Sequence, residues 1–282
     1  MAAVTFNSIS LLQEFYSWLF PPPNIPKYGV PLPPEPHRVI DAQEVGDRPF
    51  LIVGDIHACC DEFKDLVTEA KRRAGFEDIF IVCVGDMLNK GPKNQETIQF
   101  LRDLSAKGQL AAVRGNHEES ILREYMSKTR DKEYSLPERY QYLNDFSEED
   151  FDFLLKLPYT LRIPKINALV VHAGVVPNVD LARQKYIDLS HMRNLIYSYH
   201  VWGSSVRGNS KCDIGVGWAT MWSGPQHVYF GHDARRSVQD LPHATGLDSG
   251  CLYGKQLTGV IIDASLRRQF VSVDAKQVYS PP

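Results

Sequence analysis

The chain has 282 residues, of which 43% are hydrophobic and 23% are charged, and its formal net charge at pH 7 is -3. This composition is that of an ordinary globular protein, and a chain of this length buries enough surface for one large domain. The small negative charge argues against strong attraction to double-stranded nucleic acid or to an anionic membrane.

The N-terminal part, residues 1–36, is expected to stand apart from a main domain at residues 37–282. The stretch SISLLQEFYSWLF at 8–20 is amphipathic and lacks the Lys and Arg of a signal peptide or a membrane-surface helix. We interpret it as a helix docked on its own domain, with a partner-binding helix as the alternative. The proline-rich stretch at 20–36 is expected to run extended over the surface.

Strands and helices then alternate along the chain. Short apolar runs predict five strands, at 49–53, 79–84, 110–114, 168–171 and 227–230. Apolar residues at helical spacing predict four helices, at 61–75, 93–108, 118–127 and 147–158. The last of these opens with a capping box from Ser147 to Asp150. This order predicts an α/β fold with helices on both faces of a sheet, and the tail at 258–279 predicts further β-structure.

The five cysteines form neither a disulfide framework nor a zinc pattern of paired Cys residues. The sequence also lacks a run of about 20 apolar residues that would predict a transmembrane helix. We therefore expect a cytoplasmic protein with reduced thiols, and a monomer as the default state.

Polar residues follow each predicted strand at the point where the apolar run ends. In chain order these residues are Asp55 and His57, then Asp86, then Asn116 and His117, then His172, and finally His232. Because ligands of α/β sheets bind beyond the carboxyl ends of the strands, we expect these side chains to converge. Oxygen and imidazole donors without thiolates suit Mn, Fe, Zn, Co or Mg. Of these side chains, six would suit two ions about 3.5–4 Å apart that share one carboxylate: Asp55, His57, Asp86, Asn116, His172 and His232.

Five motifs, GDIHACC, GDMLNKGP, GNHEE, VHAGVVP and GHD, resemble those of the phosphoprotein-phosphatase superfamily of calcineurin-like metallophosphoesterases. GHDARR, GLDSGCLYGKQLTG and the Lys-Gly-Pro at 90–92 make the chain most similar to the ApaH-like phosphatases, the diadenosine-tetraphosphatase branch. The resemblance implies a central β-sandwich flanked by helices. It also implies a first metal on Asp55 and His57, a second on Asn116, His172 and His232, and Asp86 as the bridge.

The resemblance further implies the chemistry of the site. Two cations, Mn²⁺ first and Zn²⁺, Fe²⁺, Co²⁺ or Mg²⁺ as alternatives, would activate a bridging water for in-line attack on phosphorus. His117 is implied as the general acid that protonates the leaving oxygen. Candidates to hold phosphate oxygens are Lys90 and Arg193, with Arg114, Arg235 and Arg236 as weaker ones.

Two departures from the protein-phosphatase pattern bear on the substrate. Ala58 stands where the family has Gly, so a left-handed backbone there would be strained. Asn89 and Lys90 stand where protein phosphatases have Asp and Arg. By resemblance the missing Asp orients the acid histidine, and a neutral Asn supports an imidazolium less well. Because an anhydride leaving group needs less proton donation than a serine alkoxide, these departures favour phosphoanhydrides.

We therefore expect a metal-dependent hydrolase of phosphoanhydrides in dinucleoside polyphosphates, in capped RNA 5′ ends, as in mRNA decapping, or in inorganic polyphosphate. The net acidity weighs against long polyanions unless a basic groove lies beside the site. A protein Ser/Thr phosphatase and a non-catalytic metal-binding scaffold are the alternatives. Candidates to stack on a nucleobase, with core packing as their commoner role, are Tyr197, Tyr199, Trp202, Trp218 and Trp222.

Overall fold

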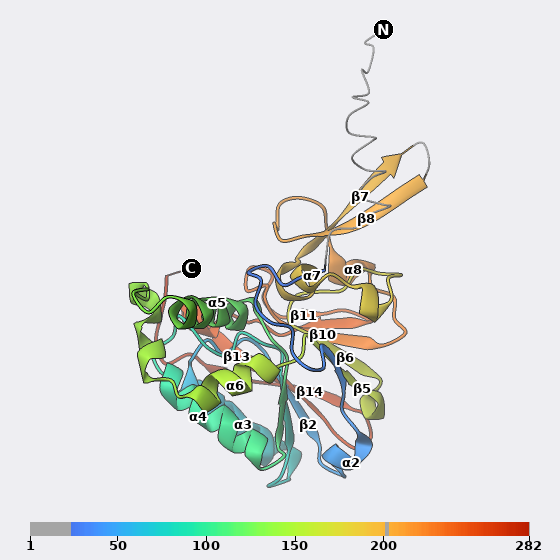
Figure 1. The fold of residues 1–282 in the computed structure, drawn as a ribbon. Coiled ribbons are helices and arrows are strands. Elements are labelled where there is room, and N and C mark those ends of the chain that lie inside the picture. Colours follow the sequence, from blue (N-terminus) through green and yellow to red (C-terminus); the bar gives the residue numbers. More distant parts are fainter. Residues whose placement is uncertain (1–23, 201–202, 282) are drawn as a thin grey trace, which may run out of the picture.

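The centre of the fold consists of two sheets, seen in the computed structural model, which describes residues 24–200 and 203–281 (Figure 1). The five-stranded sheet has the order β14-β13-β2-β3-β4 and the six-stranded sheet the order β1-β5-β6-β10-β12-β11. The first contains β2 (Phe50–Val53), β3 (Phe80–Cys83), β4 (Leu110–Ala112), β13 (Gln256–Ile262) and β14 (Arg268–Asp274). The second contains β1 (His37–Val39), β5 (Thr160–Ile163), β6 (Ala168–Val171), β10 (His227–Phe230), β11 (Gln239–Asp240) and β12 (Ala244–Gly246).

The two sheets pack face to face as the predicted β-sandwich. Along β2, Phe50 and Ile52 point into the core between the sheets, whereas Leu51 and Val53 point to the helices on the other side. All four are buried, because successive side chains of a strand point to opposite faces and both faces are covered. This explains why the predicted strands read as continuous apolar runs. The predicted β-structure in the tail is confirmed as β13 and β14.

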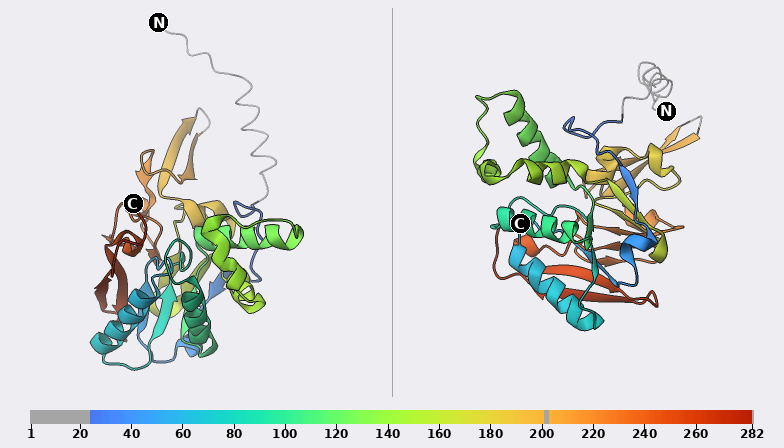
Figure 2. Two further views of the ribbon diagram at one scale, coloured as in Figure 1. Left: turned by 90° about the vertical axis from the view of Figure 1, so that its left-hand side faces the viewer. Right: turned by 60° about the horizontal axis from the view of Figure 1, so that its bottom comes forward.

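Helices cover the outer faces of the sandwich. The larger group lies over the five-stranded sheet and contains α3 (Cys60–Ala74), α4 (Asn94–Ala106), α5 (Asn116–Arg130) and α6 (Glu148–Lys156), as Figures 1 and 2 show. Two short helices, α7 (Tyr186–His191) and α8 (Trp218–Met221), pack on the six-stranded sheet. The predicted capping box at α6 is confirmed. The Ser147 hydroxyl accepts a hydrogen bond from the Asp150 backbone N–H, and the Asp150 carboxylate accepts one from the Ser147 backbone N–H. No helix among the described residues is long and apolar enough to span a bilayer.

Short elements complete the chain. These are α2 (Ala42–Val45) and the 3₁₀ turns η1 (Glu138–Asp145), η2 (Pro164–Ile166), η3 (Leu181–Arg183) and η4 (Cys251–Tyr253). A small third sheet, in the order β8-β7-β9, projects from the sandwich (Figure 1). It contains β7 (Asn194–His200), β8 (Gly203–Asn209) and β9 (Val216–Gly217). This sheet was not predicted, because its strands are not apolar runs.

The described part of the proline-rich segment runs extended over the domain, as predicted. Val30 is buried in the core beneath the helices, and the Asn24 side chain donates a hydrogen bond to the Gln184 carbonyl at 2.8 Å. The guanidinium of Arg114 donates to the Pro31 carbonyl at 2.9 Å. The segment is thus attached to residues 37–282 and does not hang free. The predicted helix at 8–20 lies outside the described residues.

Candidate dinuclear metal centre

The carboxyl ends of five strands meet at one place between the two sheets. β2, β3 and β4 run parallel in one sheet, and β6 and β10 run parallel in the other. The main-chain carbonyl of Asp86, which follows β3, accepts hydrogen bonds from the N–H groups of Ile56 and His57, which follow β2. Across the sandwich, an Asp55 carboxylate oxygen accepts the His232 N–H at 3.1 Å. Because the parallel strands end at the same edge of each sheet, the polar residues that follow them lie around one cavity.

Asp86 is the residue that this cavity is built around. Its Oδ2 lies 3.8 Å from His57 Nε2 and 3.9 Å from His117 Nε2, and its Oδ1 lies 3.4 Å from His172 Nε2. Two groups of donor atoms within 4.8 Å of one another result, one of His57, Asp86 and His117 and the other of Asp86, His172 and His232. Two ligands of one ion lie roughly 3 to 3.5 Å apart, so both groups have room for a cation.

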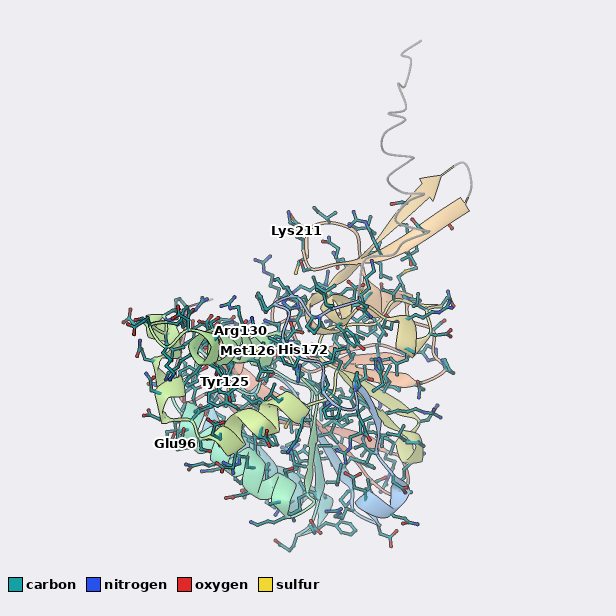
Figure 3. All side chains as sticks on the ribbon, in the orientation of Figure 1. Glu96, Tyr125, Met126, Arg130, His172 and Lys211 are labelled. Atoms are coloured by element: carbon teal, nitrogen blue, oxygen red, sulfur yellow. The ribbon has the colours of Figure 1, made fainter. Side chains whose placement is uncertain are left out.

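Hydrogen bonds orient the imidazoles of the second group. His172 Nδ1 lies 3.0 Å from the Val84 carbonyl, which leaves Nε2 to face Asp86 and the Asn116 amide oxygen, 3.0 Å away. His232 Nε2 lies 3.1 Å from the His191 carbonyl, which leaves its Nδ1 free. When a carbonyl accepts the proton of one ring nitrogen, the other nitrogen keeps its lone pair for a metal. In Figure 3, His172 lies in the interior of the molecule.

The protonation equilibria of the cavity fit a cation. Burial lowers the pKa of His57 to about 4 and that of His117 to about 3, so both imidazoles are neutral at pH 7. Burial, with the nearby carboxylates, raises the pKa of Asp55 and brings that of Asp248 to about 6. Neutral imidazoles, and carboxylates whose ionisation burial makes less favourable, are groups that a divalent cation would stabilise.

The backbone of the cavity is strained. Non-glycine residues with positive φ cluster here, namely His57, Ala58, Asp86, Asn89, Lys90 and His232. Ala58, at which the sequence analysis noted that a left-handed backbone would be strained, adopts that conformation, with φ of 56°. Glycine is required at 115, where a Cβ would collide with the Asp86 carboxylate, and at 231, where it would collide with the Asp55 carboxylate. Such strain persists only where surrounding contacts over-determine the loop, as at functional sites.

Glu118 supplies much of that support and was not identified from the sequence. It is fully buried, and its Oε2 accepts the N–H groups of Asp86 and Gly115 at 2.8 Å each. Its Oε1 accepts those of Met87 at 2.9 Å and Leu88 at 3.3 Å. One carboxylate thereby ties the loop after β3 to the first turn of α5. The signal available in the sequence was the position of Glu118 in the GNHEE motif.

Four cations line the mouth of the cavity, which has a volume of about 350 Å³. They are Lys90, Arg193, Arg235 and Lys255, so Lys90 and Arg193 lie where the sequence analysis expected them. Arg193 is anchored by hydrogen bonds to the His232 carbonyl at 2.9 Å and the Ser210 carbonyl at 3.1 Å. Asp248 and Tyr253, which sequence reasoning did not single out, also line the cavity.

The prediction of Arg114 as a phosphate-binding residue was wrong. Its side chain is fully buried, and its guanidinium donates to the carbonyls of Pro31, Leu154 and Leu155. It therefore ties the proline-rich segment to the end of α6, away from the cavity. Arg236 is likewise engaged, by the Asp233 carboxylate and by the Asn194 side chain at 2.6 Å.

The aromatic residues between the fourth and fifth motifs whose side chains are described, Tyr197, Trp218 and Trp222, do not line the cavity. Trp218 is buried against Phe230, and Trp222 donates its ring N–H to the Gln226 carbonyl. Tyr197 is exposed on the projecting sheet. The side chains of Tyr199 and Trp202 lie outside the described residues. The aromatic ring at the cavity is that of Tyr253, from η4.

Comparisons with known proteins agree with this geometry. Residues 48–248 match the family model for calcineurin-like phosphoesterases. A crystal structure of a "putative diadenosine tetraphosphatase" is 30% identical, covers 86% of this chain and 98% of its own, and superposes with a TM-score of 0.71. The asymmetrical bis(5′-nucleosyl)-tetraphosphatase PrpE of Bacillus subtilis is 25% identical over 74% of this chain and 89% of its own length.

A zinc-dependent endopolyphosphatase of Saccharomyces cerevisiae is 22% identical over 79% of this chain and 78% of its own length. The family match covers more than half of the chain and includes most of the residues that line the cavity. Calcineurin-like phosphoesterases are enzymes of divalent metals, and the donor set around Asp86 suits such ions. The chain therefore belongs to the calcineurin-like phosphoesterase family.

Proposed function

We propose that this chain hydrolyses phosphoanhydride bonds with two divalent metal ions, Mn²⁺ before Zn²⁺, Fe²⁺, Co²⁺ or Mg²⁺. One ion would be held by Asp55, His57 and Asp86, and the other by Asp86, Asn116, His172 and His232. The observation that carries the proposal is that Asp86 belongs to both groups of donor atoms, through opposite oxygens. Two bound cations supply an activated water for attack on phosphorus and neutralise the charge on its oxygens.

His117 is proposed as the proton donor to the leaving oxygen. The Asn89 amide oxygen accepts the Lys90 N–H at 2.9 Å, so its amide nitrogen faces His117 Nδ1, also 2.9 Å away. Nδ1 then accepts a hydrogen bond, and the proton of the neutral ring sits on Nε2, which faces the cavity. A neutral Nε2–H can donate a hydrogen bond to the leaving oxygen, which is enough for the stable leaving group of an anhydride but not for an alkoxide that must take up a proton.

The cations at the mouth are proposed to hold the phosphate oxygens. Lys90 lies on the same turn as Asn89, and Arg193 is fixed beside His232. Arg235 and Lys255 bring two further positive charges to the same cavity. Four cations match a chain of several phosphates better than a single phosphomonoester, because each added phosphate adds charge that must be neutralised.

The relatives support the same substrate class. PrpE is named for a dinucleoside tetraphosphate and the yeast relative for polyphosphate, and both substrates contain phosphoanhydride bonds. Tyr253, which lines the cavity, is proposed to stack on the base of a nucleotide substrate, whether a dinucleoside polyphosphate or an RNA cap. We therefore propose anhydrides of several phosphates as substrates and phosphoproteins as poor ones.

The test offers the purified chain, loaded with Mn²⁺, four substrates side by side and analyses the products. The substrates are diadenosine tetraphosphate, a capped oligonucleotide, inorganic polyphosphate and a phosphoserine peptide. We expect cleavage of at least one anhydride at a rate far above that of the peptide. The control, His117→Ala, should keep its metal content and lose roughly 10²–10⁴-fold in kcat. Equal rates on peptide and anhydrides, or turnover that survives in His117→Ala, would contradict the proposal.

A further inference from the structure

A second cavity, of about 310 Å³, lies on the other side of the segment that carries Arg193. Its lining residues come from the proline-rich segment, from α7 and the residues on either side of it, and from the end of β8 and the residue after it. Three of them are exposed cations, Lys27, Lys185 and Arg207, one from each of these segments. Among the described residues, none of the three takes part in an ion pair. Three unpaired cations in one hollow attract a multiply charged anion.

The carboxylate in this cavity, Asp188, does not offset these charges fully. It lines the cavity, is partly buried, and packs against Gly208, where a Cβ would collide with it. Burial raises the pKa of Asp188, so its charge is disfavoured. Lys211, next to Ser210 on the loop after β8, is another exposed cation near by (Figure 3). The cavity is therefore positive in a chain whose formal net charge is -3.

A thin wall separates this cavity from the candidate metal centre. Arg193, which lines the metal-site cavity, donates its backbone N–H to the Asn209 carbonyl at 2.8 Å and its Nη1 to the Ser210 carbonyl at 3.1 Å. Asn209 and Ser210 line the second cavity. His191 also lines it, and the His191 carbonyl contacts His232 Nε2. Arg193 therefore lies between the two cavities, and a ligand long enough to extend over it would reach from one to the other.

We propose that the second cavity binds the distal part of a long inorganic polyphosphate whose scissile anhydride lies at the metal centre. This rests on the proposed function and selects a substrate within it. Sites for single-stranded nucleic acid combine cations with aromatic platforms. Among the residues that the structure describes, the lining contains no Phe, Tyr or Trp, and its apolar residues, Ile187 and Met192, offer no flat ring. Charge without stacking fits a phosphate chain better than RNA.

The test compares the double variant Lys185→Ala/Arg207→Ala with the matched control Lys107→Ala/Arg130→Ala, which removes two exposed cations elsewhere. The readout is the ratio of KM for long-chain polyphosphate to KM for tripolyphosphate, at fixed free Mn²⁺. We expect the ratio to rise roughly tenfold in the test variant and to stay unchanged in the control. An unchanged ratio, or a rise for a capped oligonucleotide alone, would overturn the proposal, the latter in favour of RNA.

Equilibrium binding of long-chain polyphosphate to the His117→Ala chain provides a second readout that needs no turnover. Adding Lys185→Ala/Arg207→Ala should weaken this binding roughly tenfold and make it less sensitive to salt, since fewer counterions are released. If the original chain hydrolyses none of the substrates but the binding difference is observed, only the proposed function is refuted. If the original chain hydrolyses anhydrides but the binding difference is absent, only the proposed binding of polyphosphate in the second cavity is refuted.

Discussion

Asn89 decides which nitrogen of His117 carries the proton. Its amide oxygen is occupied by the Lys90 N–H, so its amide nitrogen must face His117 Nδ1. A carboxylate at this position would instead accept a hydrogen bond from Nδ1–H and stabilise the charged ring. The choice of Asn over Asp therefore sets how strong an acid the site offers, and this links one side chain to the class of leaving group.

The substitution Asn89→Asp should shift the substrate preference towards phosphomonoesters. A charged ring protonates an alkoxide more effectively, so the ratio of kcat/KM for a phosphoserine peptide to that for diadenosine tetraphosphate should rise roughly tenfold or more. Asn144→Asp, the same change on the exposed η1 turn, serves as the control. If both variants leave the ratio at its original value, Asn89 does not tune the acid.

At the scale of elements, the loop after β3 depends on the first turn of α5. Glu118 gathers four backbone N–H groups from these two elements onto one buried carboxylate. The loop carries Asp86, and the helix begins with Asn116, so the clamp fixes the distance between two of the predicted ligands. Strained backbone at Asp86, with φ of 49°, needs such a partner.

Glu118→Gln should weaken both the fold and metal binding. The new amide group places a donor where N–H donors already converge, which should cost about 1–3 kcal/mol in the free energy of unfolding. Denaturant unfolding of the metal-free chain and titration with Mn²⁺ measure the two effects. Glu149→Gln, in the exposed first turn of α6, should change neither. Metal affinity that is equal in the two variants would show that the clamp has no part in the site.

The elements that the sequence predicts well are those that are buried on both faces. β2 and β6 appear as apolar runs because each lies between two cores, and Gly or polar residues mark their ends. β7 and β8 pair mainly with each other away from the sandwich, so no burial pattern marks them. Their register depends on backbone hydrogen bonds, which residues of almost any type can make, so the sequence does not reveal it.

The residues of the candidate site also differ in how well the sequence predicts them. Asp55, Asp86 and His172 were predicted because each follows an apolar run, either directly or after a single Gly. Glu118 was missed, since its role consists of hydrogen bonds to backbone groups, which any carboxylate could make. Arg114 was assigned wrongly, because nothing in the sequence reveals that the proline-rich segment folds over it.

At the scale of the whole molecule, Arg268 ties the two sheets together at the end away from the site. It extends from β14 in one sheet to Thr245 at 2.9 Å, Asp240 at 3.1 Å and His227 at 3.1 Å in the other. Burial, followed by the charge of Arg268, lowers the pKa of His227 to about 4. Protonation of His227 would therefore place a second positive charge beside Arg268 and weaken these contacts between the sheets.

This pKa predicts a specific loss of stability in acid. The folded pKa of His227, about 4, lies below the ordinary value of 6.5, so its contribution is complete above pH 6.5 and is lost as pH falls towards 4. His227→Asn removes the titration. The difference in unfolding free energy between the original chain and this variant should shrink between pH 7.5 and pH 5, measured by urea unfolding without metal. A difference that is constant with pH would contradict the role of His227.

The central claim is that two ions share Asp86. Anomalous diffraction from crystals of the Mn²⁺-loaded chain tests it most directly. The account predicts two strong peaks about 3.5–4 Å apart, one on each side of the Asp86 carboxylate. One peak would come from the ion beside His57 and the other from the ion between His172 and His232. A single peak, or peaks that do not contact Asp86, would contradict the account.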